Sequence, residues 1–184
     1  MKAIFLVIFL AHSFLTVFSA QAQLEVPFYP ETDQQLKIYT SAIDAAYENK
    51  KPVIFILGRK TCVWCHSLGN LISSTELGRN IEALSTIQPI NLTGDAQQVV
   101  DRLKSRAGLI EKIPGYPFIF VVDPMRDLTT AISLAEFEHN IPEQGIYTHH
   151  PELVLAGVFY GLGLPLGTIE NNSINLCNEY LIGY

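Results

Sequence analysis

The sequence has few cysteines, few charges and no apolar run of the length that crosses a bilayer. Of its 184 residues, 3 are cysteines and 16% are charged. An odd count of three cysteines does not match the even, spaced set of a disulfide scaffold. The 12 Lys and Arg residues are outnumbered by 18 Asp and Glu and form no basic stripe. The composition therefore argues against partners such as nucleic acid or an anionic membrane surface.

The first 22 residues have the composition of a secretory signal peptide. Lys2 is the only charge before position 25, and residues 3–10 are apolar. Ala20-Gln21-Ala22 is the small-x-small pattern that precedes signal peptidase cleavage. An uncleaved membrane anchor is the alternative, but the run is shorter than the ~20 residues that span a bilayer. We therefore predict an exported protein, periplasmic or secreted, that leaves the membrane after cleavage.

Removal of 22 residues leaves 162, which is the length of one domain with its own hydrophobic core. We predict a single domain over residues 23–184, with a core at about residues 33–160 and a tail over residues 161–184. The sequence contains no internal repeat and no linker. The expected order is helix, strand, helix, strand, helix, strand, strand, helix. That order indicates an α/β fold with a mixed sheet.

Apolar patterning places the individual elements. Two unbroken apolar runs, residues 53–57 and 118–122, predict strands that are buried on both faces. Residues 87–92 predict another strand, and residues 129–134 an antiparallel neighbour for 118–122. Helical spacing predicts the helices, which begin at a capping-box pattern at Thr32 and Gln35, at the cysteine pair, and near residues 75, 95 and 151. Residues 135–151 carry little pattern.

The segment Cys62-Val63-Trp64-Cys65 follows the first buried strand and begins a helix. Two thiols three positions apart in a first helical turn lie close enough to form and break a disulfide. The helix N-terminus and the nearby charges of Arg59 and Lys60 favour the thiolate of Cys62. Cys62 is therefore the predicted nucleophile, and Cys65 is the predicted resolving thiol.

Two neighbours of these cysteines are predicted to assist them. Trp64 offers an aromatic surface for substrate binding, and His66 is a candidate proton shuttle or electrostatic stabiliser of the thiolate. The cysteine pair itself is the redox group, so we expect no metal and no dissociable cofactor. Cys177 lies near the C-terminus without an obvious partner in the sequence.

Other functions use the same residues. In one alternative, the protein is a binding module: the cysteines form a structural bridge, and a groove near Trp64, Tyr116 and Phe118 holds a peptide or partner. Cys62-x-x-Cys65-His66 also matches the c-type haem attachment pattern, although two buried strands argue against a small helical haem protein. A zinc site needs a second pair of ligands. A metal site at His139, His149 and His150 is disfavoured because such histidines are more often exposed loop residues.

Residues 51–57, a short loop and residues 62–66 together resemble the core of the thioredoxin-like superfamily. Residues 115–123 resemble that family's cis-proline loop and the strand after it, and the resemblance spans about residues 33–134. It implies a thioredoxin-like fold, a central mixed β-sheet flanked by helices. It also implies a cis peptide at Tyr116–Pro117 that faces the cysteines and presents the backbone of Tyr116 to a substrate.

The resemblance further implies an enzyme, a thiol-disulfide oxidoreductase with a CxWC centre. Its partners would be cysteine-containing exported proteins and a redox protein that recycles it. Three positions depart from the family pattern. Thr61 stands where a tryptophan is common, Ile56 where many members have a buried carboxylate, and Phe118 where a threonine is common.

Overall fold

A computed structural model describes residues 27–141 and 146–164. The predictions for residues 1–22 and 165–184, including Cys177, lie outside the described residues. The helices are α1 (Gln35–Asn49), α2 (Val63–Ser74), α3 (Glu76–Leu84), α4 (Ala96–Ala107) and α5 (Pro151–Gly161), with a short 3-10 turn η1 (Ala135–Phe137). The strands are β1 (Val53–Gly58), β2 (Thr86–Asn91), β3 (Phe118–Asp123), β4 (Leu128–Ser133), β5 (Glu138–Ile141) and β6 (Ile146–His149).

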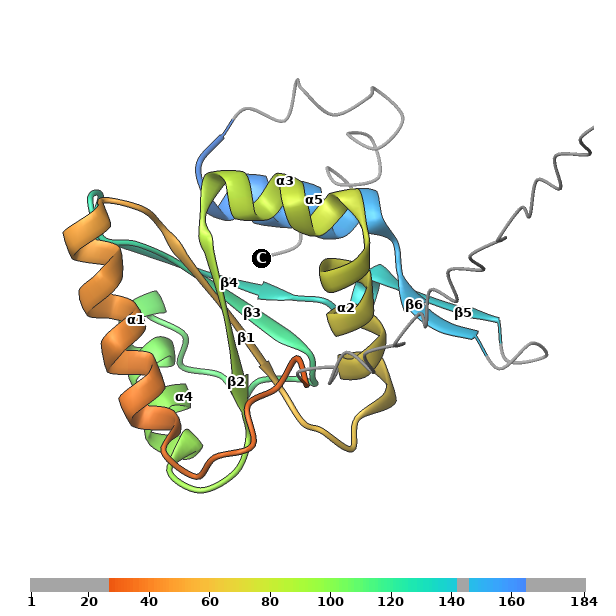
Figure 1. The fold of residues 1–184 in the computed structure, drawn as a ribbon, viewed down its shortest axis with the longest axis horizontal. Coiled ribbons are helices and arrows are strands. Elements are labelled where there is room, and N and C mark those ends of the chain that lie inside the picture. Colours follow the sequence, from red (N-terminus) through yellow and green to blue (C-terminus); the bar gives the residue numbers. More distant parts are fainter. Residues whose placement is uncertain (1–26, 142–145, 165–184) are drawn as a thin grey trace, which may run out of the picture.

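Four strands form a mixed central sheet in the order β2-β1-β3-β4. Strand β1 pairs parallel with β2 and antiparallel with β3, and β3 pairs antiparallel with β4 as predicted. Helices α1 and α4 cover one face of this sheet, and α2, α3 and α5 cover the other (Figure 1). The sheet, the helices on both faces and the cysteine pair after β1 confirm the thioredoxin-like fold.

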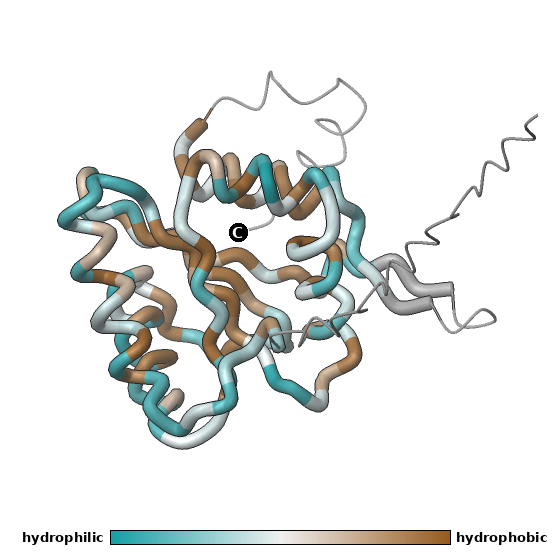
Figure 2. The backbone as a smooth tube through the Cα atoms, viewed as in Figure 1, coloured by the Kyte–Doolittle hydropathy of each residue, from teal (hydrophilic) through white to brown (hydrophobic). Residues whose placement is uncertain are grey.

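The two central strands are buried on both faces, as their unbroken apolar runs predicted. Val53, Phe55 and Leu57 pack into a cluster with α1 and α4. Ile54 and Ile56 point to the opposite face and pack with α2, α3 and α5. Side chains alternate between the faces of a strand, so a strand covered on both sides has no polar positions. Figure 2 shows these strands as the apolar centre of the molecule.

The sequence pattern assigned no helix or strand to residues 135–151, but the structure has regular elements there. These residues contain η1 and an antiparallel hairpin of β5 and β6, in which Glu138 lies opposite His149. Strand β6 packs against α2. The hairpin is stabilised by the pairing of β5 with β6 and by the contact of β6 with α2. Its sequence does not alternate between apolar and polar residues. The sequence therefore gave no periodic signal for it.

Helix α1 begins at Gln35 rather than at the predicted capping box. No side chain caps its first turn from within the helix. Instead, the backbone N–H of Leu36 donates to Oδ1 of Asp95 at 2.9 Å. Asp95 precedes α4, so one carboxylate joins the starts of two helices that lie on the same face of the sheet.

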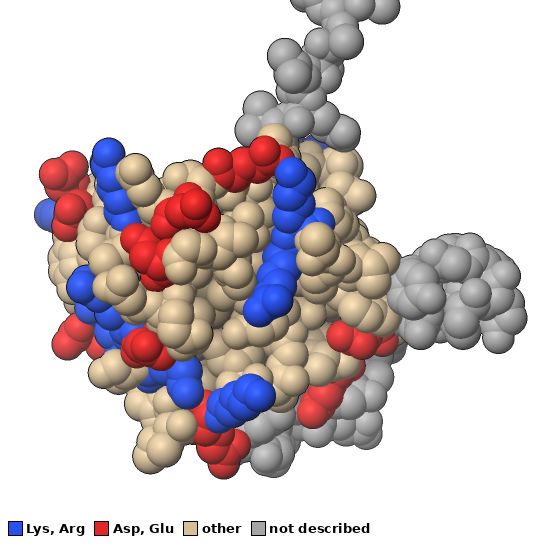
Figure 3. Space-filling view, turned by 90° about the horizontal axis from the view of Figure 1, so that it is seen from below, with Lys and Arg blue, Asp and Glu red and all other residues tan. Residues whose placement is uncertain are grey.

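The charges on the described surface are mixed. On the face seen from below in Figure 3, Lys and Arg side chains lie among Asp and Glu, and no broad area of one sign is present. Within residues 27–141 and 146–164, no helix has both the length and the apolar character to cross a membrane.

The close contact between α2 and α3 at Gly78 can be tested by substitution. A Cβ atom at this position would lie 1.7 Å from the carbonyl oxygen of Ile72, which is backbone and cannot rotate away. We expect Gly78→Ala to lower the free energy of unfolding by at least about 2 kcal/mol in urea denaturation. Gly115→Ala is the control, because a Cβ there meets no atom within 4 Å. Equal stability of the two variants would contradict the close contact.

Candidate redox site

Cys62 and Cys65 form a disulfide at the start of α2, with their Cα atoms 5.2 Å apart. Cys62 is the N-cap residue of the helix and has extended backbone geometry. Its backbone is held against the loop after β1, because the N–H of Cys62 donates to the carbonyl of Arg59 at 3.1 Å. The structure thus brings the two predicted cysteines together beyond the C-terminal end of the central strand β1.

The helix supplies a hydrogen bond to the sulfur of Cys62. The backbone N–H of Cys65 donates to Sγ of Cys62 at 3.2 Å. A hydrogen bond to a sulfur that becomes charged favours the charged form, and the positive end of the helix dipole acts in the same direction. This geometry favours a thiolate at Cys62 when the disulfide is reduced.

The two cysteines have different surroundings. Cys62 is partly exposed, whereas Cys65 is completely buried in an apolar cluster that also contains Ile56 and Leu68. Ile56 is the position at which many thioredoxin-like proteins have a carboxylate. Apolar burial disfavours a thiolate. The surroundings therefore favour Cys62 over Cys65 as the attacking sulfur.

The Tyr116–Pro117 segment lies beside Cys62. The peptide bond between Tyr116 and Pro117 is cis, and the carbonyl oxygen of Tyr116 lies 3.7 Å from Sγ of Cys62. Burial raises the pKa of the Tyr116 hydroxyl, and the positive charge of Arg59 partly opposes this shift. A peptide attached to Cys62 would therefore meet the backbone of Tyr116.

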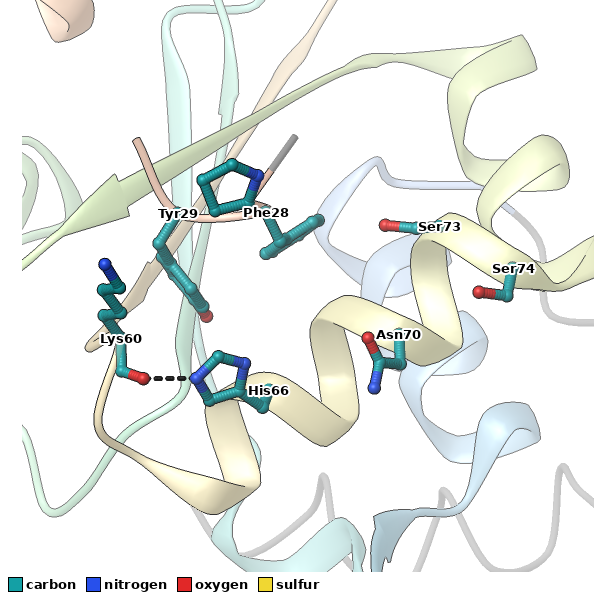
Figure 4. Close-up of a pocket in the computed structure, with 8 residues that line it drawn as sticks. Phe28, Tyr29, Lys60, His66, Asn70, Ser73 and Ser74 are labelled. Carbon is teal, nitrogen blue, oxygen red and sulfur yellow. Dashed lines mark hydrogen bonds between the residues drawn. The ribbon is translucent and has the colours of Figure 1, made fainter. Parts of the chain in front are cut away.

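Lys60 and His66 are engaged with other groups. Lys60 forms an ion pair with Glu31, which offsets the positive charge that the sequence placed near Cys62. Nε2 of His66 donates to the carbonyl oxygen of Lys60. Figure 4 shows the His66 ring turned toward that carbonyl. Together with Phe28 and Tyr29, His66 lines a groove of about 250 Å³. The proton-shuttle role of His66 stays a prediction.

Trp64 packs against a histidine that sequence reasoning did not connect with the site. The rings of Trp64 and His149 have centroids 5.6 Å apart and planes at 71°, an edge-on arrangement. His149 is 1% exposed, and burial lowers the pKa of its imidazole from 6.5 to about 4. The imidazole is therefore neutral at pH 7. Because His149 belongs to the unpredicted hairpin, no sequence signal could have shown this contact.

Among the residues that the structure describes, there is no group of three or more His, Cys, Asp and Glu side chains that could hold a metal ion. His149 is buried against Trp64 and is not the exposed loop residue that the sequence suggested. Its neighbour His150 is exposed and precedes α5.

Comparison with known proteins finds solved structures with a similar chain path. Among them is a crystal structure of a disulphide isomerase from Xylella fastidiosa Temecula1, with a TM-score of 0.46 and 13% sequence identity. The match covers 83% of this chain and 98% of that chain. No protein-family model and no curated protein matches the sequence.

The different burial of the two cysteines predicts selective alkylation. After reduction of the folded protein, we expect iodoacetamide to modify Cys62 at least about tenfold faster than Cys65. Peptide mapping by mass spectrometry measures each site separately and distinguishes both from Cys177. In urea the two rates should become similar. Equal rates in the folded protein would contradict the described burial.

Burial of His149 predicts a loss of stability in acid. The pKa of the His149 imidazole is about 4 in the folded chain and 6.5 in the unfolded chain, where the ring is not buried. Between these two values, the unfolded chain binds a proton that the folded chain does not. The free energy of unfolding should fall by up to about 3 kcal/mol as the pH drops from 6.5 through 4. His149→Phe should remove this part of the pH dependence.

The comparison with His149→Phe is needed because Glu138 lies opposite His149 in the hairpin. Burial raises the pKa of Glu138, which makes the folded state relatively more stable as the pH falls through the carboxyl range. This effect has the opposite sign and is common to both proteins. Parallel stability curves for the wild type and His149→Phe would contradict the burial of a neutral imidazole.

Proposed function

We propose that this chain is a thiol-disulfide oxidoreductase that exchanges disulfides with cysteine-containing exported proteins. The observation that carries the proposal is the asymmetry of the cysteine pair. Cys62 is partly exposed and its Sγ accepts a hydrogen bond from the N-terminus of α2, whereas its disulfide partner Cys65 is buried. Only a thiolate attacks a disulfide, and this arrangement favours one thiolate at the surface.

The exchange has two steps, and both keep atoms and electrons in balance. The Cys62 thiolate attacks a substrate disulfide, forms a mixed disulfide and releases one substrate thiolate. Cys65 then loses its proton and attacks Sγ of Cys62, which restores the Cys62–Cys65 disulfide and releases the second substrate thiolate. The cysteine pair loses two electrons, and the substrate disulfide gains them. The same steps in reverse oxidise a substrate dithiol.

The neighbouring residues have supporting roles in this proposal. Tyr116 and Pro117 lie beside the attacking sulfur and would contact the substrate backbone in the mixed disulfide. Trp64 adds apolar surface between the two cysteines. His66 would receive or supply protons through Nδ1, since Nε2 is bonded to the carbonyl of Lys60.

The proposed location is outside the cytoplasm, in the periplasm or the secreted fraction. The support is the apolar N-terminal segment with Lys2 before it and Ala20-Gln21-Ala22 after it. Disulfides persist in such compartments, where the substrates would be other exported proteins. Continued turnover requires a second redox protein that restores the starting state of the pair.

Trapping of mixed disulfides tests this function. We expect full-length Cys65→Ala to accumulate adducts with exported proteins, because the resolving thiol is missing and Cys62 stays bound to its substrate. Non-reducing gels and mass spectrometry of the adducts identify the bonded cysteines. Cys62→Ala is the matched control and should form none. Absence of adducts in the Cys65→Ala strain, or adducts through Cys177 alone, would contradict the proposal.

A further inference from the structure

His149 is a buried polar residue with no hydrogen-bonding partner within the described parts of the chain. Its side chain is 1% exposed, and neither ring nitrogen has a partner there. An unpaired buried polar group costs stability, so its presence in a core needs a reason. An aliphatic side chain would fill this position without that cost.

The ring of His149 makes one defined aromatic contact, and that contact is with the cysteine motif. Its partner Trp64 is the second residue of α2, between Cys62 and Cys65 in the same helical turn. Edge-on aromatic pairs are more favourable than their buried area alone explains. Strand β6 therefore meets the redox turn through a contact with a specific orientation.

The contact also joins two parts of the fold that are distant in sequence. Helix α2 follows β1, whereas β6 belongs to a hairpin outside the four-stranded sheet. The hairpin extends beside α2 in Figure 1. Because Trp64 is in the first turn of α2, restraint of its indole also restrains the backbone that supplies the Cys65 N–H to Sγ of Cys62.

We propose that His149 is a positioning residue for the cysteine pair: its ring holds the Trp64 indole and so fixes the helical turn that stabilises the Cys62 sulfur. His149 touches neither substrate nor the reacting sulfurs in this role. The inference deepens the proposed function, because the consequence of positioning is a change in the redox equilibrium of Cys62 and Cys65.

The sequence provides a direct probe, since Trp64 is the only tryptophan in the chain. We expect His149→Ala to increase acrylamide quenching of Trp64 fluorescence in the oxidised protein. The equilibrium constant of the pair with dithiothreitol should shift by between about twofold and tenfold, the range of one aromatic contact. His149→Phe should restore both values toward the wild type because it keeps an aromatic ring.

Two further variants make the result decisive. His150→Ala, the matched control, removes an exposed histidine one position away and should change neither value. His149→Gln keeps a polar group without an aromatic ring and should resemble His149→Ala. If His149→Ala fails to fold, His149→Gln takes its place in both measurements. Circular dichroism and cooperative unfolding establish that each variant is native.

Either of two outcomes overturns the inference. A folded His149→Ala or His149→Gln protein with wild-type quenching and equilibrium shows that the ring positions nothing. Altered quenching with an unchanged equilibrium shows that the ring holds Trp64 without influence on the cysteines. Both readouts use purified protein and dithiothreitol. They therefore stay informative even if the trapping experiment finds no substrates and the proposed function fails.

Discussion

The hydrogen bond from the Cys65 N–H to Sγ of Cys62 is the contact on which the site depends. It exists because Cys62 is the N-cap of α2, and α2 starts there because β1 ends at Gly58 in a fixed place at the centre of the sheet. Strand β1 is fixed in turn by apolar side chains buried on both faces. Core burial thus determines where one sulfur meets the positive end of a helix.

The same helical turn gives its two sulfurs opposite environments. One side of the turn faces the loop and the Tyr116 carbonyl, where Cys62 is partly exposed. The other side faces the apolar cluster of Ile56 and Leu68, where Cys65 is buried. A single helix start therefore separates a partly exposed sulfur-bearing residue from a buried one, and these are the attacking and resolving cysteines of the proposed exchange. Because Ile56 has no titratable group, this strand position offers no base that could accept the proton of Cys65.

The sequence was sufficient for the sheet and the cysteine turn but not for the hairpin. The unbroken apolar runs of β1 and β3 and the spacing of Cys62 and Cys65 depend on local pattern, which sequence reasoning can read. The β5–β6 hairpin depends on its own cross-strand pairing and on contact with α2. Such tertiary contacts leave no periodicity, so the role of His149 beside Trp64 emerged only from the folded chain.

The central claim is that the start of α2 favours the thiolate of Cys62 in the reduced protein. The most direct test is the pH dependence of its alkylation rate, followed by mass spectrometry at that residue. The account predicts that Cys62 still reacts rapidly at pH 6, well below the ionisation of a free cysteine at about 8.5. A rate that follows the titration of free cysteine would contradict it, because the helix start would then have no effect on the sulfur.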